Sequence, residues 1–321
     1  MKIEFVPSIL TPVDEGLLFG FSTERDTPED VEIEIIDADN DTVVGVQKLY
    51  QVTEGVVNIS PYVTRFTERE PCVGKWSFIT FNEVECAHYK IRVGGVESDT
   101  ITISPLRCKP SPVEVVSKMP AEREISYGEC DEVVICAEPD DEVEVSVSYR
   151  DGSVSFRDNP ESGLMHLVVI PDYFDDDVPE MSVEFMINGK REQKMHYKVV
   201  PKSKRALRLA WVAESGVIEH YTFPMVCSLK ERAVKERIGL GESLDVASLS
   251  VEKSIKVVSN YESRSVVEAL ADIISSPAVW VEADNEAHKV DVLTSEIEYN
   301  AIGSLDRVAL EVRLKRGECA L

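Results

Sequence analysis

The chain has 321 residues, of which 34 are basic and 59 acidic, so its formal net charge is −25. So acidic a chain is a poor partner for nucleic-acid phosphates or an anionic membrane surface, and no apolar run reaches the ~18 residues of a membrane span. Hydrophobic residues make up 43 %, too many for a disordered chain, and the length predicts two or three domains. The first sixteen residues carry one Lys and are interrupted by Pro7 and Pro12, so we expect no secretory signal.

The first hundred residues show short strands separated by turns. Residues 31–35 alternate strictly between apolar and acidic, residues 37–41 are rich in Asp and Asn, and residues 42–49 resume a strand, which predicts a hairpin. Residues 76–81 and 89–93 are predicted to form another strand pair, and residues 100–104 a last strand. This spacing predicts an immunoglobulin-like β-sandwich over residues 1–104.

A second β-sandwich is predicted over residues 105–203, after a linker that contains Pro105, Pro110 and Pro112. Asn188-Gly189 is a strong turn signal between strands at residues 181–187 and 195–200. Further strands are expected at residues 132–136, 143–149 and 163–170.

The last segment, residues 204–321, predicts an α+β module with an antiparallel sheet. Residues 207–211 and 217–223 form a hairpin around a turn that contains Gly216, and further strands are expected at residues 255–258, 278–281 and 308–314. Gly239 and Gly241 lack the third glycine of a dinucleotide-binding loop, so a plain loop is expected there.

One short helix is predicted in this module. Ser265 and Glu268 have the spacing of a capping box, and the apolar residues 266, 267, 270, 273 and 274 fall on one face. Pro277 is expected to end the helix, because a residue before proline avoids the helical conformation.

Three stretches carry a family resemblance: Leu209-Ala210-Trp211 followed by Gly216 and Tyr221-Thr222-Phe223, residues 275–280 with 290–294, and residues 56–62. They resemble uncharacterised β-rich proteins that phages and prophages of gut bacteria encode. Asn58 replaces the usual Asp of the first domain, and the hairpin turn is altered at Ala213 and Ser215.

The resemblance implies a non-enzymatic structural protein of a phage tail or virion, assembled in the host cytoplasm, that acts through contacts with other virion or tail proteins and forms a homo-oligomer. It implies no catalytic residue. Read as packing residues alone, Trp211, Tyr221 and Phe223 would belong to a core.

Catalytic, cofactor and metal motifs are absent from the sequence. The five histidines show no zinc-binding spacing, and His220 is expected to pack or to face solvent.

Asp37, Asp39 and Asp41 begin like a calcium loop, but Thr42 and Lys48 occupy the positions that need Gly and Glu. A solvated turn is therefore favoured there, and a solvated acidic loop at Asp172 and residues 175–177. We expect no cofactor, no metal and no enzyme, although 59 acids leave a carboxylate hydrolase open.

Seven cysteines are present, and none are spaced as Cys-x-x-Cys. An odd count leaves at least one unpaired within the chain. We expect free, mostly buried thiols in a protein made in a reducing cytoplasm, rather than a structural disulfide.

The three segments differ in charge: residues 1–104 carry −11, residues 105–203 carry −10 and residues 204–321 carry −4. Because like charges repel at a symmetric interface, we expect the last module to oligomerise and the sandwiches to project outward. Residues 308–314 are either an edge strand for pairing between subunits or internal to their own sheet.

An alternative function is a surface-associated module that binds carbohydrate or protein through the sandwich loops.

Overall fold

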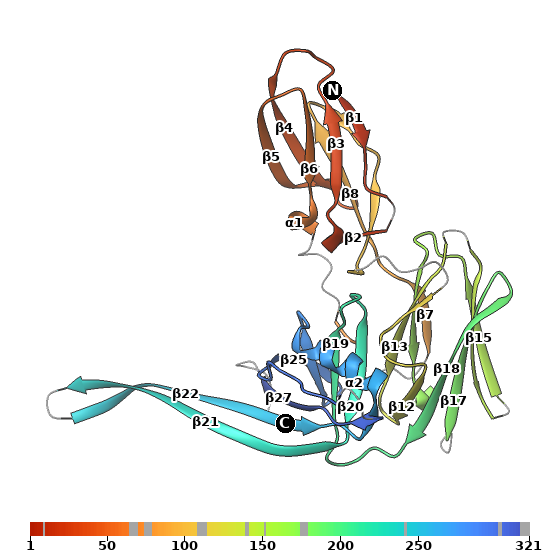
Figure 1. Cartoon of the computed structure of the whole chain (residues 1–321), viewed down its shortest axis with the longest axis vertical. Helices are drawn as coiled ribbons and strands as arrows, with labels where there is room; N and C mark the ends of the chain where they lie inside the picture. Colours follow the sequence, from red (N-terminus) through yellow and green to blue (C-terminus); the bar gives the residue numbers. More distant parts are fainter. Residues whose placement is uncertain are drawn as a thin grey trace.

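A computed structural model of the chain describes residues 1–8, 10–63, 70–73, 79–107, 114–138, 141–150, 152–173, 179–240, 243–300 and 304–314. These residues are mainly β: two immunoglobulin-like β-sandwiches precede an antiparallel sheet with a short helix, which confirms the predicted fold class. The first sandwich stands above the other two modules, and a long two-stranded ribbon projects to one side (Figure 1). Among the described residues, no helix has the length and apolar character needed to cross a membrane.

The first sandwich packs a three-stranded sheet on a larger one. The alternation in β4 (Glu29–Asp37) buries Val31, Ile33 and Ile35, and the predicted hairpin of β4 with β5 (Thr42–Val52) is confirmed. The remaining elements are β1 (Lys2–Phe5), β2 (Thr11–Pro12), η1 (Val13–Glu15), β3 (Leu18–Ser22), β6 (Glu54–Asn58), α1 (Ser60–Val63), β8 (Ala87–Val93), β9 (Val96–Glu97) and β10 (Ile101–Ser104). The smaller sheet is β1-β3-β6, and the larger follows the order β2-β10-β8-β4-β5, with β9 on β8.

Strand β7 (Thr80–Glu83) departs from the predicted pairing. It does not pair with β8 but lies antiparallel to β16 (Leu164–Val169), with Phe81 opposite Leu167. Residues 76–78 of the predicted strand lie outside the described residues. The first sequence segment thus contributes a strand to the second sandwich, which no local pattern indicates.

The second sandwich has one sheet in the order β11-β13-β16-β7 and another in the order β12-β18-β17-β14-β15. The predicted hairpin of β17 with β18 is confirmed, and both Asn188 and Gly189 have positive φ, as a tight hairpin turn requires. The other elements are β11 (Glu114–Val116), β12 (Glu122–Ser126), β13 (Asp131–Cys136), β14 (Val143–Tyr149), β15 (Gly152–Asp158), η2 (Pro171–Tyr173), β17 (Glu180–Ile187) and β18 (Lys190–Val200).

The third module is a seven-stranded sheet in the order β20-β19-β24-β25-β27-β22-β21. Strand β27 (Ala309–Leu314) lies between β25 and β22. The prediction of an edge strand at residues 308–314 is therefore wrong, and the alternative, a strand internal to its own sheet, is confirmed. The other elements are β19 (Leu207–Val212), β20 (Ile218–Phe223), β21 (Met225–Leu240), β22 (Ser243–Val258), β23 (Glu262–Ser263), β24 (Val279–Ala283), β25 (Glu286–Val292) and β26 (Leu305–Asp306).

The helix of this module begins earlier than the capping box predicted. In α2 (Arg264–Ala271) the N-cap is Ser263, while Ser265 is exposed within the first turn and Glu268 accepts a hydrogen bond from Arg264. The capping box is therefore wrong, because the β23–β26 pairing holds Ser263 extended just before the helix. The apolar face is confirmed, and the helical winding ends with η3 (Asp272–Ile274), just before Pro277.

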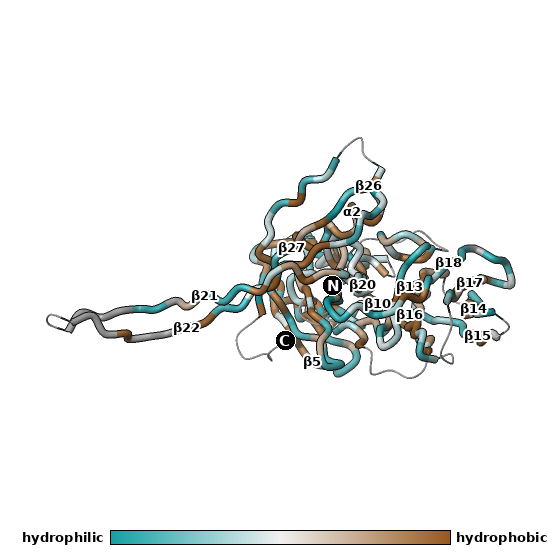
Figure 2. The backbone as a smooth tube through the Cα atoms, turned by 90° about the horizontal axis from the view of Figure 1, so that it is seen from below, coloured by the Kyte–Doolittle hydropathy of each residue, from teal (hydrophilic) through white to brown (hydrophobic). Residues whose placement is uncertain are grey.

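The projecting ribbon consists of β21 and β22, which pair with each other along their whole length. Figure 2 shows it projecting away from the body of the molecule. Gly239, expected in a loop, pairs with Leu244 inside the ribbon, whereas Gly241 lies outside the described residues. Only residues 255–258 were predicted as strand.

The second and third modules share one apolar core, whereas the first has its own. Val116, Val134 and Leu164 of the second sandwich belong to the same cluster as Leu209 and Trp211 of the third module. The core of the first sandwich draws only on residues of that sandwich. The second and third modules therefore form one folded body.

Candidate functional site: a buried ionic cluster between the second and third modules

Charged side chains are buried where β13 of the second sandwich meets β19 and β20 of the third module. None of the individual segments signals such a site, since the residues come from distant parts of the chain. The cluster consists of five acids and three bases: Glu129, Asp131, Glu132, Glu219, Glu282, Arg123, Arg208 and His220.

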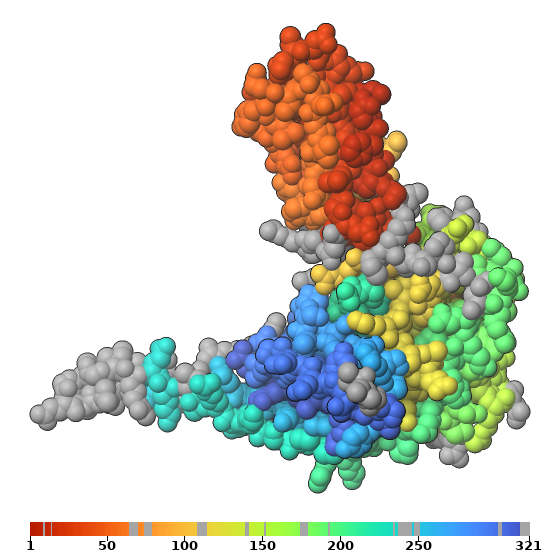
Figure 3. Space-filling view, in the orientation of Figure 1, coloured from red at the N-terminus to blue at the C-terminus, as the bar shows by residue number. Residues whose placement is uncertain are grey.

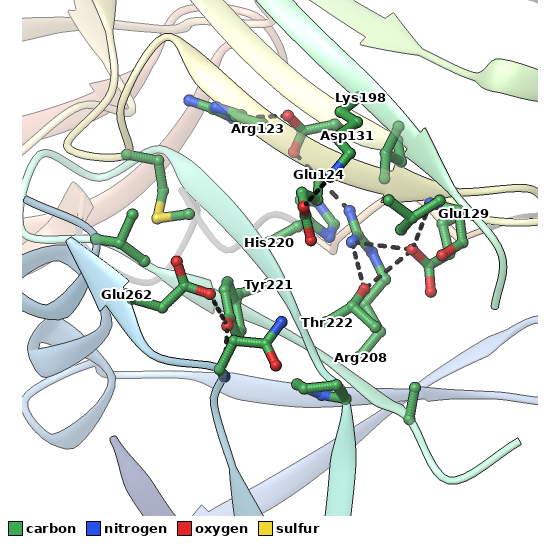
Figure 4. Close-up of a pocket in the computed structure, with 18 of the residues that line it drawn as sticks. Arg123, Glu124, Glu129, Asp131, Lys198, Arg208, His220, Tyr221, Thr222 and Glu262 are labelled. Carbon is green, nitrogen blue, oxygen red and sulfur yellow. Dashed lines mark hydrogen bonds and ion pairs between the residues drawn. The ribbon is translucent and has the colours of Figure 1, made fainter. Parts of the chain in front are cut away.

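Arg208 on β19 lies at the centre of this cluster. Its guanidinium pairs with Glu282 at 3.2 Å and with Glu129 at 3.5 Å, and it donates to the Thr222 hydroxyl at 2.9 Å and to the Cys130 carbonyl. Figure 4 shows the Arg208 side chain directed toward Glu129 and Thr222. Burial alone would lower the pKa of Arg208, but the surrounding carboxylates raise it, so this cation is permanent.

Arg123 on β12 makes a second buried pair. It donates to Asp131 at 2.7 Å, and the Tyr197 hydroxyl donates to the same carboxylate oxygen at 2.8 Å. Glu219 approaches Arg123 at 3.6 Å and accepts from the Ser117 hydroxyl at 2.6 Å. Burial raises the pKa of Glu219 in spite of Arg123, so this is the acid of the cluster that most readily holds a proton.

His220 on β20 bridges two carboxylates. Its Nε2 lies 2.9 Å from Glu132 and its Nδ1 lies 2.9 Å from Glu282, while His166 contacts the other Glu132 oxygen at 2.8 Å. Burial alone would lower the pKa of His220, but the hydrogen bonds to Glu132 and Glu282 outweigh it and raise the pKa to about 9. The prediction that His220 packs or faces solvent missed this buried ion pair.

Cys72 and Cys130 form a disulfide beside His220. The expectation of free thiols is wrong for this pair, because the segment of residues 70–73 packs against the start of β13, far along the chain. The Cys72 N–H donates to Glu132 at 2.6 Å. Cys136 is a buried free thiol whose pKa burial raises to about 11, while Cys108 and Cys319 lie outside the described residues.

A cavity of about 580 Å³ opens beside the cluster. Its lining includes Tyr221, whose hydroxyl donates to Glu262 at 2.6 Å, and the ion pair of Lys198 with Glu124 at 3.2 Å (Figure 4). Because the charged groups around it already bind one another, the arrangement is suited to fixing two modules in one orientation rather than to turning over a substrate.

The structure brings Trp211, Gly216, Tyr221 and Phe223 together in the β19–β20 hairpin. Trp211 and Phe223 are fully buried, and the Tyr221 ring meets Phe223 edge-on at 4.8 Å. Ser265, Glu268 and Pro277 belong to the helical segment and do not reach the cluster.

Gly216 fits a position that only glycine tolerates. Its φ is +90°, and a Cβ there would lie 2.7 Å from the backbone nitrogen of Arg107. The Arg107 N–H donates to the Ser215 carbonyl at 2.8 Å, so the hairpin turn binds the linker that follows the first sandwich.

The acidic turns are held by their own hydrogen bonds where they are described. Asp37 accepts from the Asp39 N–H at 3.0 Å, Asp39 contacts His88 at 2.8 Å and Asp41 pairs with Lys90 at 3.2 Å, as a solvated hairpin turn requires. Asp172 accepts from the Gly128 N–H at 2.6 Å, and residues 175–177 lie outside the described residues.

No protein-family model matches the chain, and no curated protein matches its sequence. Among solved structures, it is similar to a chain from the complex of Dpr2 Ig1-Ig2 with DIP-Theta Ig1-Ig3, at 7 % identity and a TM-score of 0.24 over 98 % of this chain and 88 % of that chain. A four-domain ectodomain fragment of ICAM-5 gives 7 % identity and a TM-score of 0.22 over 98 % and 75 %. At these scores the likeness carries no functional argument.

Proposed function

We propose that the chain is a non-enzymatic structural subunit of a phage tail or virion that assembles with further copies of itself and with other virion proteins through the β21–β22 ribbon. The observation that carries the proposal is the ribbon itself, which projects away from the rest of the molecule (Figure 3). The resemblance of the Trp211 hairpin to phage and prophage proteins supports the virion setting.

Most of the ribbon side chains that the structure describes are exposed. Each strand has 16 residues, so the ribbon is roughly 50 Å long at ~3.3 Å per residue. Strand β22 joins β27 only from Ser254 to Val258, and Leu229, Val246 and Val251 are all exposed, Leu229 at 71 %. A two-stranded hairpin is only marginally stable alone in water, so a surface on another molecule would stabilise it.

Charge favours a second copy as the partner. Strand β21 has four basic and two acidic side chains, a net charge of +2, in a chain whose net charge is −25. The two sandwiches, at −11 and −10, offer acidic surfaces to the ribbon of a neighbouring copy. Such a contact joins two different surfaces and therefore repeats into a ring or a filament.

The test replaces residues 232–252 by Asn-Gly. Glu231 and Lys253 are directly opposite in the ribbon, so a two-residue turn closes the shortened hairpin without disturbing the body. We expect wild-type protein to form oligomers in analytical ultracentrifugation and the shortened variant to sediment as a monomer. An unchanged distribution in the shortened variant would refute assembly through the ribbon.

A charge variant tests the choice of partner. Arg232→Glu with Lys235→Glu reverses two exposed cations on β21 and is expected to weaken self-association by about tenfold or more. The matched control, Lys204→Glu with Arg205→Glu, makes the same charge change at two exposed residues outside the ribbon and both sandwiches and should leave association unaltered. The virion setting is tested separately, by mass spectrometry of purified virions. Absence of the chain from them would contradict this part of the proposal.

A second candidate function, recognition of carbohydrate or protein by the first sandwich, is favoured by strand β5. This strand is an edge of its sheet and exposes Val43, Val46 and Tyr50, with Tyr50 at 70 %. A glycan array would test it: Tyr50→Ala should abolish binding while Tyr261→Ala, on the third module, should not. Absence of any bound glycan on the wild-type protein would remove the carbohydrate version.

A further inference from the structure

Three metal-binding groups meet at the joint between the modules. The Cys72 sulfur, a Glu132 oxygen and a His220 nitrogen all lie within 4.8 Å of one another, and all three residues are buried. Ligand atoms around a tetrahedral zinc ion are about 3.3–3.8 Å apart, given bonds of about 2.0–2.3 Å. Small side-chain movements therefore suffice to bring the three groups to one ion.

Cys130, the disulfide partner of Cys72, is the candidate for a fourth donor. Its sulfur is bonded to that of Cys72, so reduction of the disulfide would place two thiols beside Glu132 and His220. Two sulfurs, one imidazole and one carboxylate form a donor set that suits Zn²⁺, since soft thiolates and imidazole favour it over Mg²⁺ or Ca²⁺.

Two of the proposed ligands, His220 and Glu132, are oriented by hydrogen bonds to neighbouring side chains, as metal ligands commonly are. The Nδ1 atom of His220 lies 2.9 Å from Glu282, which orients Nε2 toward Glu132 and Cys72. A carboxylate that accepts from the far nitrogen of a metal-ligating histidine fixes its tautomer and raises its basicity. His166 holds the second oxygen of Glu132 in the same way, at 2.8 Å.

We propose that Cys72, Cys130, Glu132 and His220 bind one Zn²⁺ ion in the reduced protein, so that the disulfide and the metal are alternative links at the same joint. In the conversion, a dithiol reductant gives two electrons and two protons to the sulfur–sulfur bond and becomes a disulfide. Zinc then displaces the two thiol protons and the proton on His220 Nε2, which leave to solvent. Arg208, which donates to the Cys130 carbonyl, offsets the negative charge of the two thiolates.

The disulfide joins two parts of the chain, and the zinc ion would join the same two parts to a third, the strand that carries His220. Cys72 belongs to the connection between α1 and β7, Cys130 directly precedes β13, Glu132 lies in β13 and His220 lies in β20. In the reducing cytoplasm in which virions assemble zinc would be the link, and after release into an oxidising medium the disulfide would replace it.

The first experiment needs no variant. Full-length protein is reduced with a phosphine, freed of metal with a chelator, and titrated with Zn²⁺ or Co²⁺ under anaerobic conditions beside an oxidised sample. We expect one ion per reduced chain in native mass spectrometry, a thiolate-to-cobalt absorption band, and no binding by the oxidised chain. Failure of the reduced, folded chain to bind, or equal binding by the oxidised chain, would overturn the proposal.

Variants then assign the ligands. Cys72→Ser and His220→Gln should each weaken zinc binding by at least about tenfold, whereas Cys136→Ser, which removes a buried free thiol elsewhere, should bind as wild type. Glu282→Gln keeps all four ligands and should still weaken binding by about 10–100-fold. Binding by His220→Gln that equals wild type would show a simple dithiol site and would also overturn the proposal.

Discussion

The first sandwich and the joined second and third modules use similar acidic sequences in opposite ways. In the first sandwich the ion pairs lie at the surface, as in Arg92, which pairs with Glu34 and Glu97 at 2.6 Å each, and the apolar core is its own. At the joint of the other two modules, Arg123 and Arg208 are buried among carboxylates inside a shared apolar core. The comparison teaches that buried ion pairs help to fix the orientation of the joint, whereas the first sandwich buries only its apolar core and keeps its ion pairs at the surface.

The largest expected effect comes from cutting the chain at residue 203. Residues 204–321 expressed alone should lack a cooperative thermal transition, because Val116, Val134 and Leu164, which cover their core, are on the other fragment. Residues 1–104, expressed as a separate third fragment, should keep one, since the apolar core of the first sandwich lies wholly within them. Circular dichroism on heating measures both, and a sharp transition for residues 204–321 would show that the modules are independent.

Removal of a buried cation should come next. Arg208→Leu leaves Glu129 and Glu282 without their nearest guanidinium and is expected to lower the free energy of unfolding by about 3–5 kcal/mol. Arg92→Leu removes a half-buried cation at the surface of the first sandwich and should cause a smaller change in urea unfolding. Equal effects of the two substitutions would contradict the distinction between the two regions.

The joint should also lose stability as the pH rises. His220 has a pKa of about 9 in the folded chain and 6.5 as its ordinary value, so its contribution is complete below pH 6.5 and is lost as the pH rises to about 9. The loss is about 3 kcal/mol. Urea unfolding at pH 6 and pH 9 should show it in the wild type, and a His220→Gln variant with the same pH slope would disprove the assignment to His220.

The smallest expected loss of stability comes from replacing single glycines by alanine. Gly216 and Gly95 have nearly equal φ angles, +90° and +86°, but a Cβ at Gly216 would meet the linker backbone whereas one at Gly95 meets nothing within 4 Å. Gly95→Ala should cost about 1 kcal/mol of strain, and Gly216→Ala clearly more. Thermal melts compare them, and equal melting temperatures would mean that the linker yields to the added methyl group at no cost.

The hairpins were predictable because their signals are local. In β4 the alternation of Val31, Ile33 and Ile35 with acids marks one buried face, and Asn188-Gly189 fixes the turn between β17 and β18. The ribbon between residues 229 and 253 gives no such signal, since none of the side chains described there is buried and alternation is not required.

The candidate site could not be predicted, because its members are far apart in the chain. Cys72, Glu132 and His220 come from three segments, and the search for short metal-binding spacings cannot find a set that only the packing of β13 against β20 brings together. The sequence did carry one usable sign, since His220 lies in a strand whose neighbours Tyr221 and Phe223 mark it as part of a core hairpin.

The pairing of β7 with β16 imposes a delay during synthesis. Phe81 leaves the ribosome long before Leu167, its partner, and at about 5–20 residues per second the interval is roughly 4–17 s. The nascent first sandwich thus carries an unsatisfied strand within one of its own connections while the second sandwich is still being translated. Its hydrogen-bonding edge is open to capture by any other extended chain during that time, which makes residues 80–83 a point where two nascent copies could become entangled.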